Sequence, residues 1–246
     1  MAGTTYAQAM RLADTPAPLR AGGQADAVPA GHIRTAAAGR DDSVPAREPN
    51  SGDPVFDAAV AALEEGRDAV ASARDDLEFE GWPAPKRLAP HAVALAATAF
   101  RDGEEAGEGK LMLLYDPAGH DGWTGTFRIV IQVHADVEEE MAADPLLGEV
   151  GWSWLTDALE LHAPGYAAPS GTVTRVITEG YGAKSDHPPA TGFELRASWS
   201  PAEDGDDDEI AAEIGGAVAA WCELLASAAG LPAAGTLAIG GRRRRR

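Results

Sequence analysis

Cysteine is almost missing from this sequence, with Cys222 the single one among 246 residues. One cysteine excludes an internal disulfide framework and cannot complete a zinc site by itself. Long apolar runs are missing as well, because none approaches the ~18 apolar residues of a membrane-spanning helix. The N-terminal residues carry charges and prolines where a signal peptide has an apolar centre of ~7–15 residues. We therefore expect a cytoplasmic protein with no membrane segment.

Basic residues are also few, and their distribution is uneven. Residues 53–241 hold 10 basic and 34 acidic side chains, a net charge of −24, whereas residues 1–52 are neutral. A negative field of this size repels nucleic acid phosphates and acidic membranes, and it favours basic partners. The exception is the C-terminal run of arginines, which could bind nucleic acid weakly or lie on the acidic body: Arg242, Arg243, Arg244, Arg245 and Arg246.

The motifs of common enzyme classes are absent. Neither G-x-x-x-x-G-K-[ST] nor G-x-G-x-x-G occurs, so the chain has no recognisable phosphate-binding loop. Ser153 resembles the nucleophile of a G-x-S-x-G elbow, but Leu155 replaces the last glycine and the serine lies in a predicted helix. The six histidines show no i, i+4 pair with a third ligand nearby. We expect no catalytic centre, no metal and no cofactor.

What the sequence contains is one region with strong hydrophobic periodicity. Residues 1–52 lack it and are rich in Pro, Gly and Ala, which predicts a disordered N-terminal arm. At Asp53-Pro54 the pattern changes to a capped helix, and Gly230 and Pro232 end the last periodic segment. We therefore expect a single α+β domain over residues 53–232 and a flexible tail over 233–246.

Three segments show the helical spacing of apolar residues. The first is 53–77, with Phe56, Val60, Leu63, Val70 and Leu77 on one face. The second is 144–162, where the expected core stripe is Leu147, Val150, Trp154, Leu155, Ala158 and Leu161. The third begins in the acidic run 206–209 and carries Ile210, Ile214, Val218, Trp221, Leu225 and Ala228. Gly215-Gly216 within it predicts close packing or a bend.

Five segments read as strands, namely 91–100, 111–115, 127–134, 171–181 and 193–199. The first is ambiguous, because its alanines favour a helix while its length and alternation favour a strand, and we predict a strand. The resulting order is α-β-β-β-α-β-β-α. Short links predict a mostly antiparallel five-stranded sheet with the helices on one face. This order is similar to that of type III secretion chaperone-like folds.

The two clearest strands place polar side chains on a common outer face. Residues 127–134 and 193–199 alternate apolar and polar positions, and the polar set contains Arg128, Gln132, His134, Glu194, Arg196 and Ser198. Cross-strand charge pairing is the simplest interpretation of this set. The alternative is a binding site for a carboxylate ligand or an acidic partner. His134 would then be the natural general base, with Asp136 beside it and His120 in a nearby turn.

Several strings resemble an uncharacterised actinobacterial family, domain of unknown function 3000. They are residues 85–90 (PKRLAP), 116–119 (DPAG), 123–128 (WTGTFR), 144–147 (DPLL), 149–155 (EVGWSWL), 171–174 (GTVT), 195–199 (LRASW) and 221–225 (WCELL). The resemblance spans roughly residues 55–232, and it implies no activity and no catalytic residues.

Three functions stay open at this point. The favoured hypothesis is a non-enzymatic, adaptor-like or chaperone-like module that binds another protein, including a second copy of itself as a homodimer. The alternative is a small-molecule binder or enzyme that uses the polar face around Arg128, His134 and Arg196. The third is a nucleic-acid-associated factor that uses the arginine tail. Trp154 and Trp221 are expected to be core residues under all three.

Overall fold

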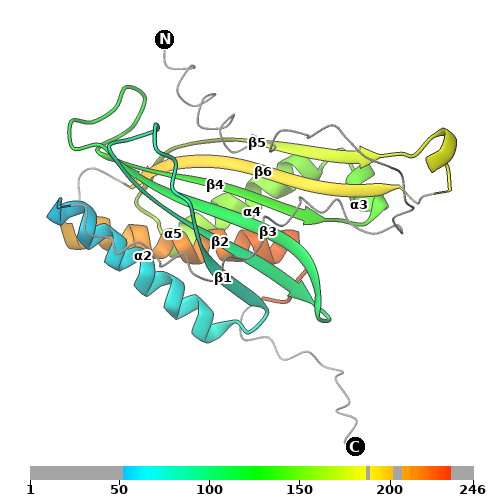
Figure 1. Cartoon of the computed structure of the whole chain (residues 1–246), viewed down its shortest axis with the longest axis horizontal. Helices are drawn as coiled ribbons and strands as arrows, with labels where there is room; N and C mark the ends of the chain where they lie inside the picture. The colour runs from blue at the N-terminus through cyan, green and yellow to red at the C-terminus, as the bar shows by residue number, and fades with distance from the viewer. Residues whose placement is uncertain (1–51, 187–188, 202–206, 234–246) are drawn as a thin grey trace, which may run out of the picture.

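The computed structural model describes residues 52–186, 189–201 and 207–233. They form a six-stranded antiparallel sheet with the strand order β1-β2-β3-β4-β6-β5, and helices cover one of its faces (Figure 1). The predicted arm over 1–52 and the predicted tail over 233–246 lie almost wholly outside the described residues. The α+β class, the antiparallel sheet and the helices on one face are confirmed.

The elements follow in this order: α2 (Pro54–Ala73), β1 (Leu77–Trp82), β2 (His91–Arg101), β3 (Glu104–Tyr115), β4 (Phe127–Asp136), α3 (Glu139–Ala143), α4 (Leu147–His162), β5 (Tyr166–Thr178), the 3-10 turn η1 (Gly182–Lys184), β6 (Ala190–Pro201) and α5 (Asp207–Ala228). Segment 91–100 is a strand, as predicted. The hairpin between β2 and β3 turns at Asp102 and Gly103, both with positive φ, which suits a tight antiparallel connection.

The sheet has six strands rather than five because Leu77–Trp82 forms β1. Helix α2 begins as expected, with Asp53 Oδ1 accepting the amide of Val55 at 3.0 Å. It ends at Ala73, earlier than expected, and Arg74 at its C-cap is already extended. Leu77 was expected on the helical face, but it is the first residue of β1 and pairs with Ala99.

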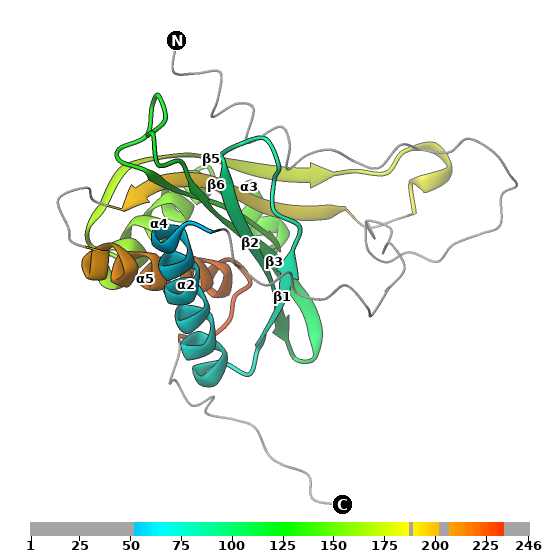
Figure 2. The same ribbon diagram turned by 60° about the vertical axis from the view of Figure 1, so that its left-hand side comes forward.

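The two faces of the sheet differ in what they contact. On the covered face, odd-numbered residues of β4 and β6 such as Ile131 and Leu195 pack against α2, α4 and α5. The other face, called the open face below, carries the even-numbered residues, with a small apolar cluster of Leu88, Leu114 and Val130 at one end. Figure 2 shows the helices gathered on one side of the sheet.

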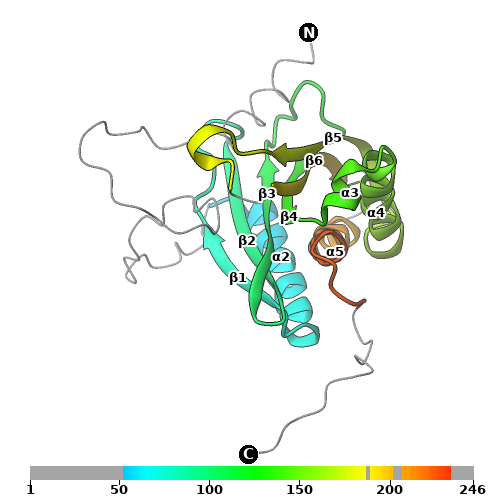
Figure 3. The same ribbon diagram turned by 90° about the vertical axis from the view of Figure 1, so that its right-hand side faces the viewer.

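Helix α5 is the centre of the helical layer and lies between α2 and α4 (Figure 3). Its predicted stripe is buried except for Ile210, which is half-buried, and Trp221 is fully enclosed. A Cβ at Gly215 would approach Ala62 O of α2 to 3.2 Å, and a Cβ at Gly216 would overlap His162 O at the end of α4. The predicted close packing at this glycine pair is therefore confirmed.

Among the described helices, α5 alone is long and apolar enough to span a membrane by length and composition. Half of its apolar window is buried, and its large side chains contact the sheet and the neighbouring helices. The core of the α+β domain thus accounts for its apolar character.

The helix predicted over 144–162 begins later than expected, and a short helix that was not predicted precedes it. Residues Glu139–Ala143 form α3, and α4 starts only at Leu147, after Asp144 Oδ1 accepts the amide of Leu146 at 2.8 Å. The buried stripe of α4 is Leu147, Gly151, Leu155, Ala158 and Leu159. Val150 and Leu161 were expected in that stripe but are exposed, because the packing centre of α4 is rotated toward Gly151, over which the ring of Phe193 lies.

Candidate functional site

The polar residues predicted on β4 and β6 lie beside one another on the open face. The register pairs Gln132 with Arg196 and His134 with Glu194. Lys110 of β3 and Thr172 of β5 extend the Gln132–Arg196 row across the sheet. Arg128 lies further along β4, beside the serines of β6.

Glu194 forms the central contacts among these polar residues of β4 and β6, which are called the polar row below. Its Oε1 accepts the side-chain amide of Gln132 at 3.1 Å and forms an ion pair with Nε of Arg196. The side chains of Arg196 and Glu194 are only 15% and 19% exposed. Gln132 Oε1 is buried and has no hydrogen-bond partner among the described residues. Arg196 is thus paired with Glu194, but the pair lies within β6 instead of between strands as expected, and only the hydrogen bond from Gln132 crosses from β4 to β6. The pairing leaves little of either charge open to a ligand.

Arg128 is buried within the sheet rather than displayed on it. Its Nη2 donates to Ser198 Oγ at 2.8 Å, to Ser198 O at 3.2 Å and to Ser170 Oγ at 3.3 Å. Its Nη1 donates to Ala168 O at 3.3 Å and to Ser200 Oγ at 3.4 Å. This guanidinium therefore joins three strands, β4, β6 and β5. Its role in binding a ligand stays a prediction.

The two histidines considered for catalysis are far apart. His120 precedes β4 and stacks on Trp123 with ring centroids 5.0 Å apart. His134 lies near the other end of β4, seven residues after Phe127, which corresponds to about 23 Å along a strand. Its Nε2 is 4.0 Å from Asp136 Oδ1, and its side chain is 41% exposed. The convergence of both histidines with Arg128, which the enzymatic alternative would need, is not found among the described residues.

The remaining candidate nucleophiles are occupied or enclosed. Ser153 Oγ donates to Val150 O at 2.9 Å on the exposed side of α4, and no strand-to-helix turn surrounds it. Cys222 is buried in α5, where burial raises the pKa of its thiol far above the usual range. Over the described ranges, no group of three His, Cys, Asp or Glu side chains could hold a metal ion.

The outer edge of β5 is a surface that the sequence did not predict. It is the last strand of the sheet, it is 13 residues long, and nearly all of its side chains are exposed. Arg175 is its one charged residue, and that side chain turns back to donate to Asp144 O at 2.8 Å. Val176 and Ile177 are exposed, the latter to 54%. The β5–β6 hairpin also continues beyond the last pair of β4 and β6 (Figure 1).

The opposite edge of the sheet, β1, has the features that usually prevent pairing with another strand. It is six residues long and carries two exposed glutamates, Glu78 and Glu80. Short length and charged side chains are the common protection of edge strands in native proteins. Between its bulge near Ala168 and its end at Thr178, β5 is longer than β1, and its one charged side chain, Arg175, turns back toward the link after α3.

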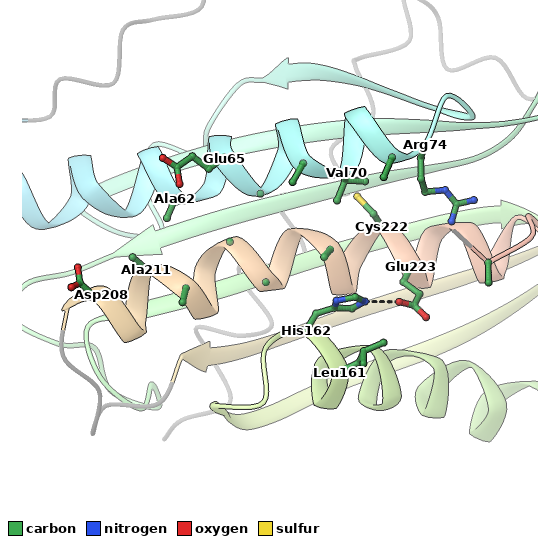
Figure 4. Close-up of a pocket in the computed structure, with 18 residues that line it drawn as sticks. Ala62, Glu65, Val70, Arg74, Leu161, His162, Asp208, Ala211, Cys222 and Glu223 are labelled. Atoms are coloured by element: carbon green, nitrogen blue, oxygen red, sulfur yellow. Dashed lines mark hydrogen bonds and ion pairs between the residues drawn. The ribbon is translucent and has the colours of Figure 1, made fainter. Parts of the chain in front are cut away.

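A second open surface is a groove on the outer side of α5, away from the sheet. Helix α5 forms its floor, and α2 and the end of α4 form its walls (Figure 4). The groove has a volume of about 890 Å³ and is lined mainly by alanine and glycine. Exposed carboxylates of Glu65 and Asp208 lie at one end, and Arg74, Cys222 and the ion pair of His162 with Glu223 lie at the other.

The fold and these surfaces define an α+β domain whose antiparallel sheet is covered by helices on one face only. The model of the family described as "Protein of unknown function (DUF3000)" matches residues 53–237. The chain belongs to this family, as its sequence strings indicated. No curated protein and no solved structure matches the chain.

Proposed function

We propose that this domain is a cytoplasmic protein-binding module that takes up an extended segment of another protein along β5. The single observation behind the proposal is the long, nearly uncharged and exposed edge of that strand. A sheet edge presents a row of backbone N–H and C=O groups toward solvent, which a peptide in extended conformation can pair with.

The side chains of β5 offer two faces to such a segment. On the open face, Thr172, Thr174 and Val176 lie beside β6 residues Arg196, Glu194 and Gly192. On the covered side, Ile177 follows Arg175, which is bonded to the link between α3 and α4. Exposed Leu146 and Val150 belong to that link and to the start of α4. Backbone pairing would supply affinity, and alternate side chains would supply specificity.

The alternatives draw less support. In the polar row, Arg196 is paired with Glu194, and Arg128 is enclosed by serine and carbonyl oxygens. A small ligand would have to break these contacts, whereas a strand added to β5 would leave them in place. The arginine tail lies outside the described residues, and the net charge of the body opposes nucleic acid.

Charge substitutions on the two sheet edges test the proposal. Lysines at Thr174 and Val176 place two positive charges on the edge that would receive the partner, whereas Glu78→Lys makes a matched change on β1. We expect affinity capture from native lysate, followed by titration with the purified captured protein, to show at least about a tenfold loss for T174K/V176K, which corresponds to ~1.4 kcal/mol. Glu78→Lys should bind like the wild type.

All three proteins should have the same thermal midpoint, because the substituted side chains are exposed. A captured protein that T174K/V176K binds as well as the wild type does would contradict a site on β5. Size-exclusion chromatography with light scattering at several concentrations shows whether the partner is a second copy of the chain.

A further inference from the structure

We propose that the groove over α5 is the docking site for the chain's own C-terminal segment, residues 234–246. The apolar residues Leu237, Ala238 and Ile239 would lie along the floor, and the five arginines would reach the acidic end. This inference is independent of the function proposed for β5, since the groove and β5 lie on different parts of the domain.

The groove is an exposed apolar surface whose floor carries charged residues only at its two ends, Asp208 and Glu223. Ala212, Gly215 and Ala219 of α5 face outward there, and Ala69 and Ala73 of α2 form one wall. Leu161, on the opposite wall, is 68% exposed. Close packing of α2 on α5 explains why positions 66 and 215 are glycine, since a Cβ at Gly66 would lie 2.5 Å from Gly215 O. It does not explain the outward-facing alanines or Leu161, which an apolar occupant would cover.

The chain leaves the described structure from inside this groove. Ala233, the last described residue, is one of its lining residues. Arg74 fixes the exit, because its Nη2 donates to Pro232 O at 3.1 Å while the same guanidinium is paired with Asp76 at 2.8 Å. Residues 234–246 therefore start at the groove, at the end opposite Glu65 and Asp208.

The length of the segment matches the length of the groove. Ala62 and Ala73 both line it and are eleven residues apart on α2, which corresponds to about 17 Å at the rise of an α-helix. Six extended residues from Ala233 to Ile239 span about 20 Å. The apolar part of the segment would thus cover the floor, and Gly240-Gly241 would let the arginines turn toward the acidic end.

The charges at that end complement the arginines. Glu65 and Asp208 have exposed carboxylates, and Asp207 precedes Asp208 on the first turn of α5. The body around the groove carries a net charge of −24 over residues 53–241, and the segment brings five positive charges. Because the segment is tethered at Ala233, its local concentration at the groove is high, and a weak contact suffices to keep it there.

Disulfide trapping in the full-length chain tests this proposal. In a Cys222→Ala background, one cysteine replaces Ile239 and a second replaces Ala212 on the groove floor. The matched control places the second cysteine at Thr172, which is also exposed but lies on the open face of the sheet. We expect intramolecular disulfide formation at least about tenfold faster for A212C/I239C than for T172C/I239C, because docking raises the effective concentration of the two thiols.

Charge reversal separates docking from random encounters. Adding Glu65→Lys and Asp208→Lys should slow trapping at Ala212, and changing the five arginines to glutamate in that variant should restore it. The proposal is overturned if the disulfide to Ile239→Cys forms equally fast from Ala212→Cys and from Thr172→Cys. It is also overturned if neither charge change alters the rate of disulfide formation in A212C/I239C. Cross-links that join two chains would assign the groove to the segment of a second copy and would likewise overturn it.

Discussion

At the residue scale, Gly109 of β3 and Trp221 of α5 depend on each other. A Cβ built at Gly109 would lie 2.7 Å from Nε1 of the fully buried indole. Protein cores are close-packed, so the ring has no free space to move into. We expect Gly109→Ala to lower the free energy of unfolding by about 1–3 kcal/mol, measured by urea denaturation.

Two further variants make this prediction specific. Gly81 lies on the edge strand β1, which β2 separates from β3, and a Cβ there meets nothing within 4 Å, so Gly81→Ala should leave stability unchanged or slightly raised. Trp221→Phe in the Gly109→Ala background should recover part of the loss, because it removes the clashing Nε1. That N–H is buried without an acceptor in the part of the chain that the structure describes. A double variant less stable than Gly109→Ala would show that the two residues are not coupled in this way.

Two carboxyl groups near the helix layer should give opposite pH dependences. Burial raises the pKa of Glu213, whose Oε2 lacks a partner among the described residues, above its usual value of 4.5. The folded state then holds the proton more tightly than the unfolded state, so this contribution to stability falls as the pH rises through the range above 4.5. Hydrogen bonding from Arg74 lowers the pKa of Asp76 below 3.8. The contribution of the Asp76 carboxylate to the stability of the folded state is therefore lost as the pH falls through that lowered pKa.

We therefore expect Glu213→Gln to raise stability at neutral pH and to lose this advantage in acid. Asp76→Asn should lower the free energy of unfolding at neutral pH. The difference between this variant and the wild type should narrow when the pH falls below the usual pKa of aspartate. Unfolding free energies from denaturant titrations across this pH range measure both effects. The same sign for both variants at neutral pH would contradict the assigned environments.

At the element scale, Arg128 fastens the edge strand β5 to the rest of the sheet. The register of β5 shifts between Ala167 and Ser170, and Ala168 within the shift has a φ of 47°. Arg128 donates to Ala168 O and Ser170 Oγ on that irregular stretch, and to Ser198 on β6. The hydrogen bonds of this buried guanidinium replace the regular backbone pairing with β6 that β5 lacks at the register shift.

Arg128→Gln should therefore lower the free energy of unfolding by about 2–3 kcal/mol, since hydrogen bonds to charged groups contribute ~1.5–3 kcal/mol. Amide exchange should also become faster around residues 167–172. The matched control is Arg67→Gln, which removes an exposed pair with Asp68 and should cost less than ~1 kcal/mol. Equal losses of unfolding free energy for the two variants would show that Arg128 does not hold β5 in this way.

The elements predictable from sequence are those with a long, uninterrupted period. Strand β4 alternates apolar and polar residues except at Val130, and α5 has an acidic start, a regular stripe and Gly230 just after its end with a φ of 66°. Strand β1 was not predicted, although Leu77 and Phe79 alternate with Glu78 and Glu80. The end of α2 has no glycine or proline, and the Arg74–Asp76 pair that forms there is visible only in three dimensions.

At the scale of the whole molecule, the surfaces that matter most for binding are set by packing between distant segments. The polar row could be predicted because alternation places its members on one face of two strands. That β5 would be the edge strand, and that α2, α4 and α5 would enclose a groove, depends on the order of the strands and on helix contacts. No local pattern in the sequence specifies either of these.

The charge of the whole domain gives a final prediction. With a net charge of −24 over residues 53–241, the folded body repels itself more than the expanded unfolded chain does. Salt screens this repulsion, since the Debye length falls from about 10 Å at 0.1 M to about 3 Å at 1 M.

The thermal midpoint should therefore rise with sodium chloride at neutral pH, and the rise should nearly vanish near the isoelectric point of about 4.6. Scanning calorimetry at both pH values measures it. A midpoint that falls with salt at neutral pH would mean that attractive pairs such as Arg196–Glu194 and His162–Glu223 outweigh the overall repulsion.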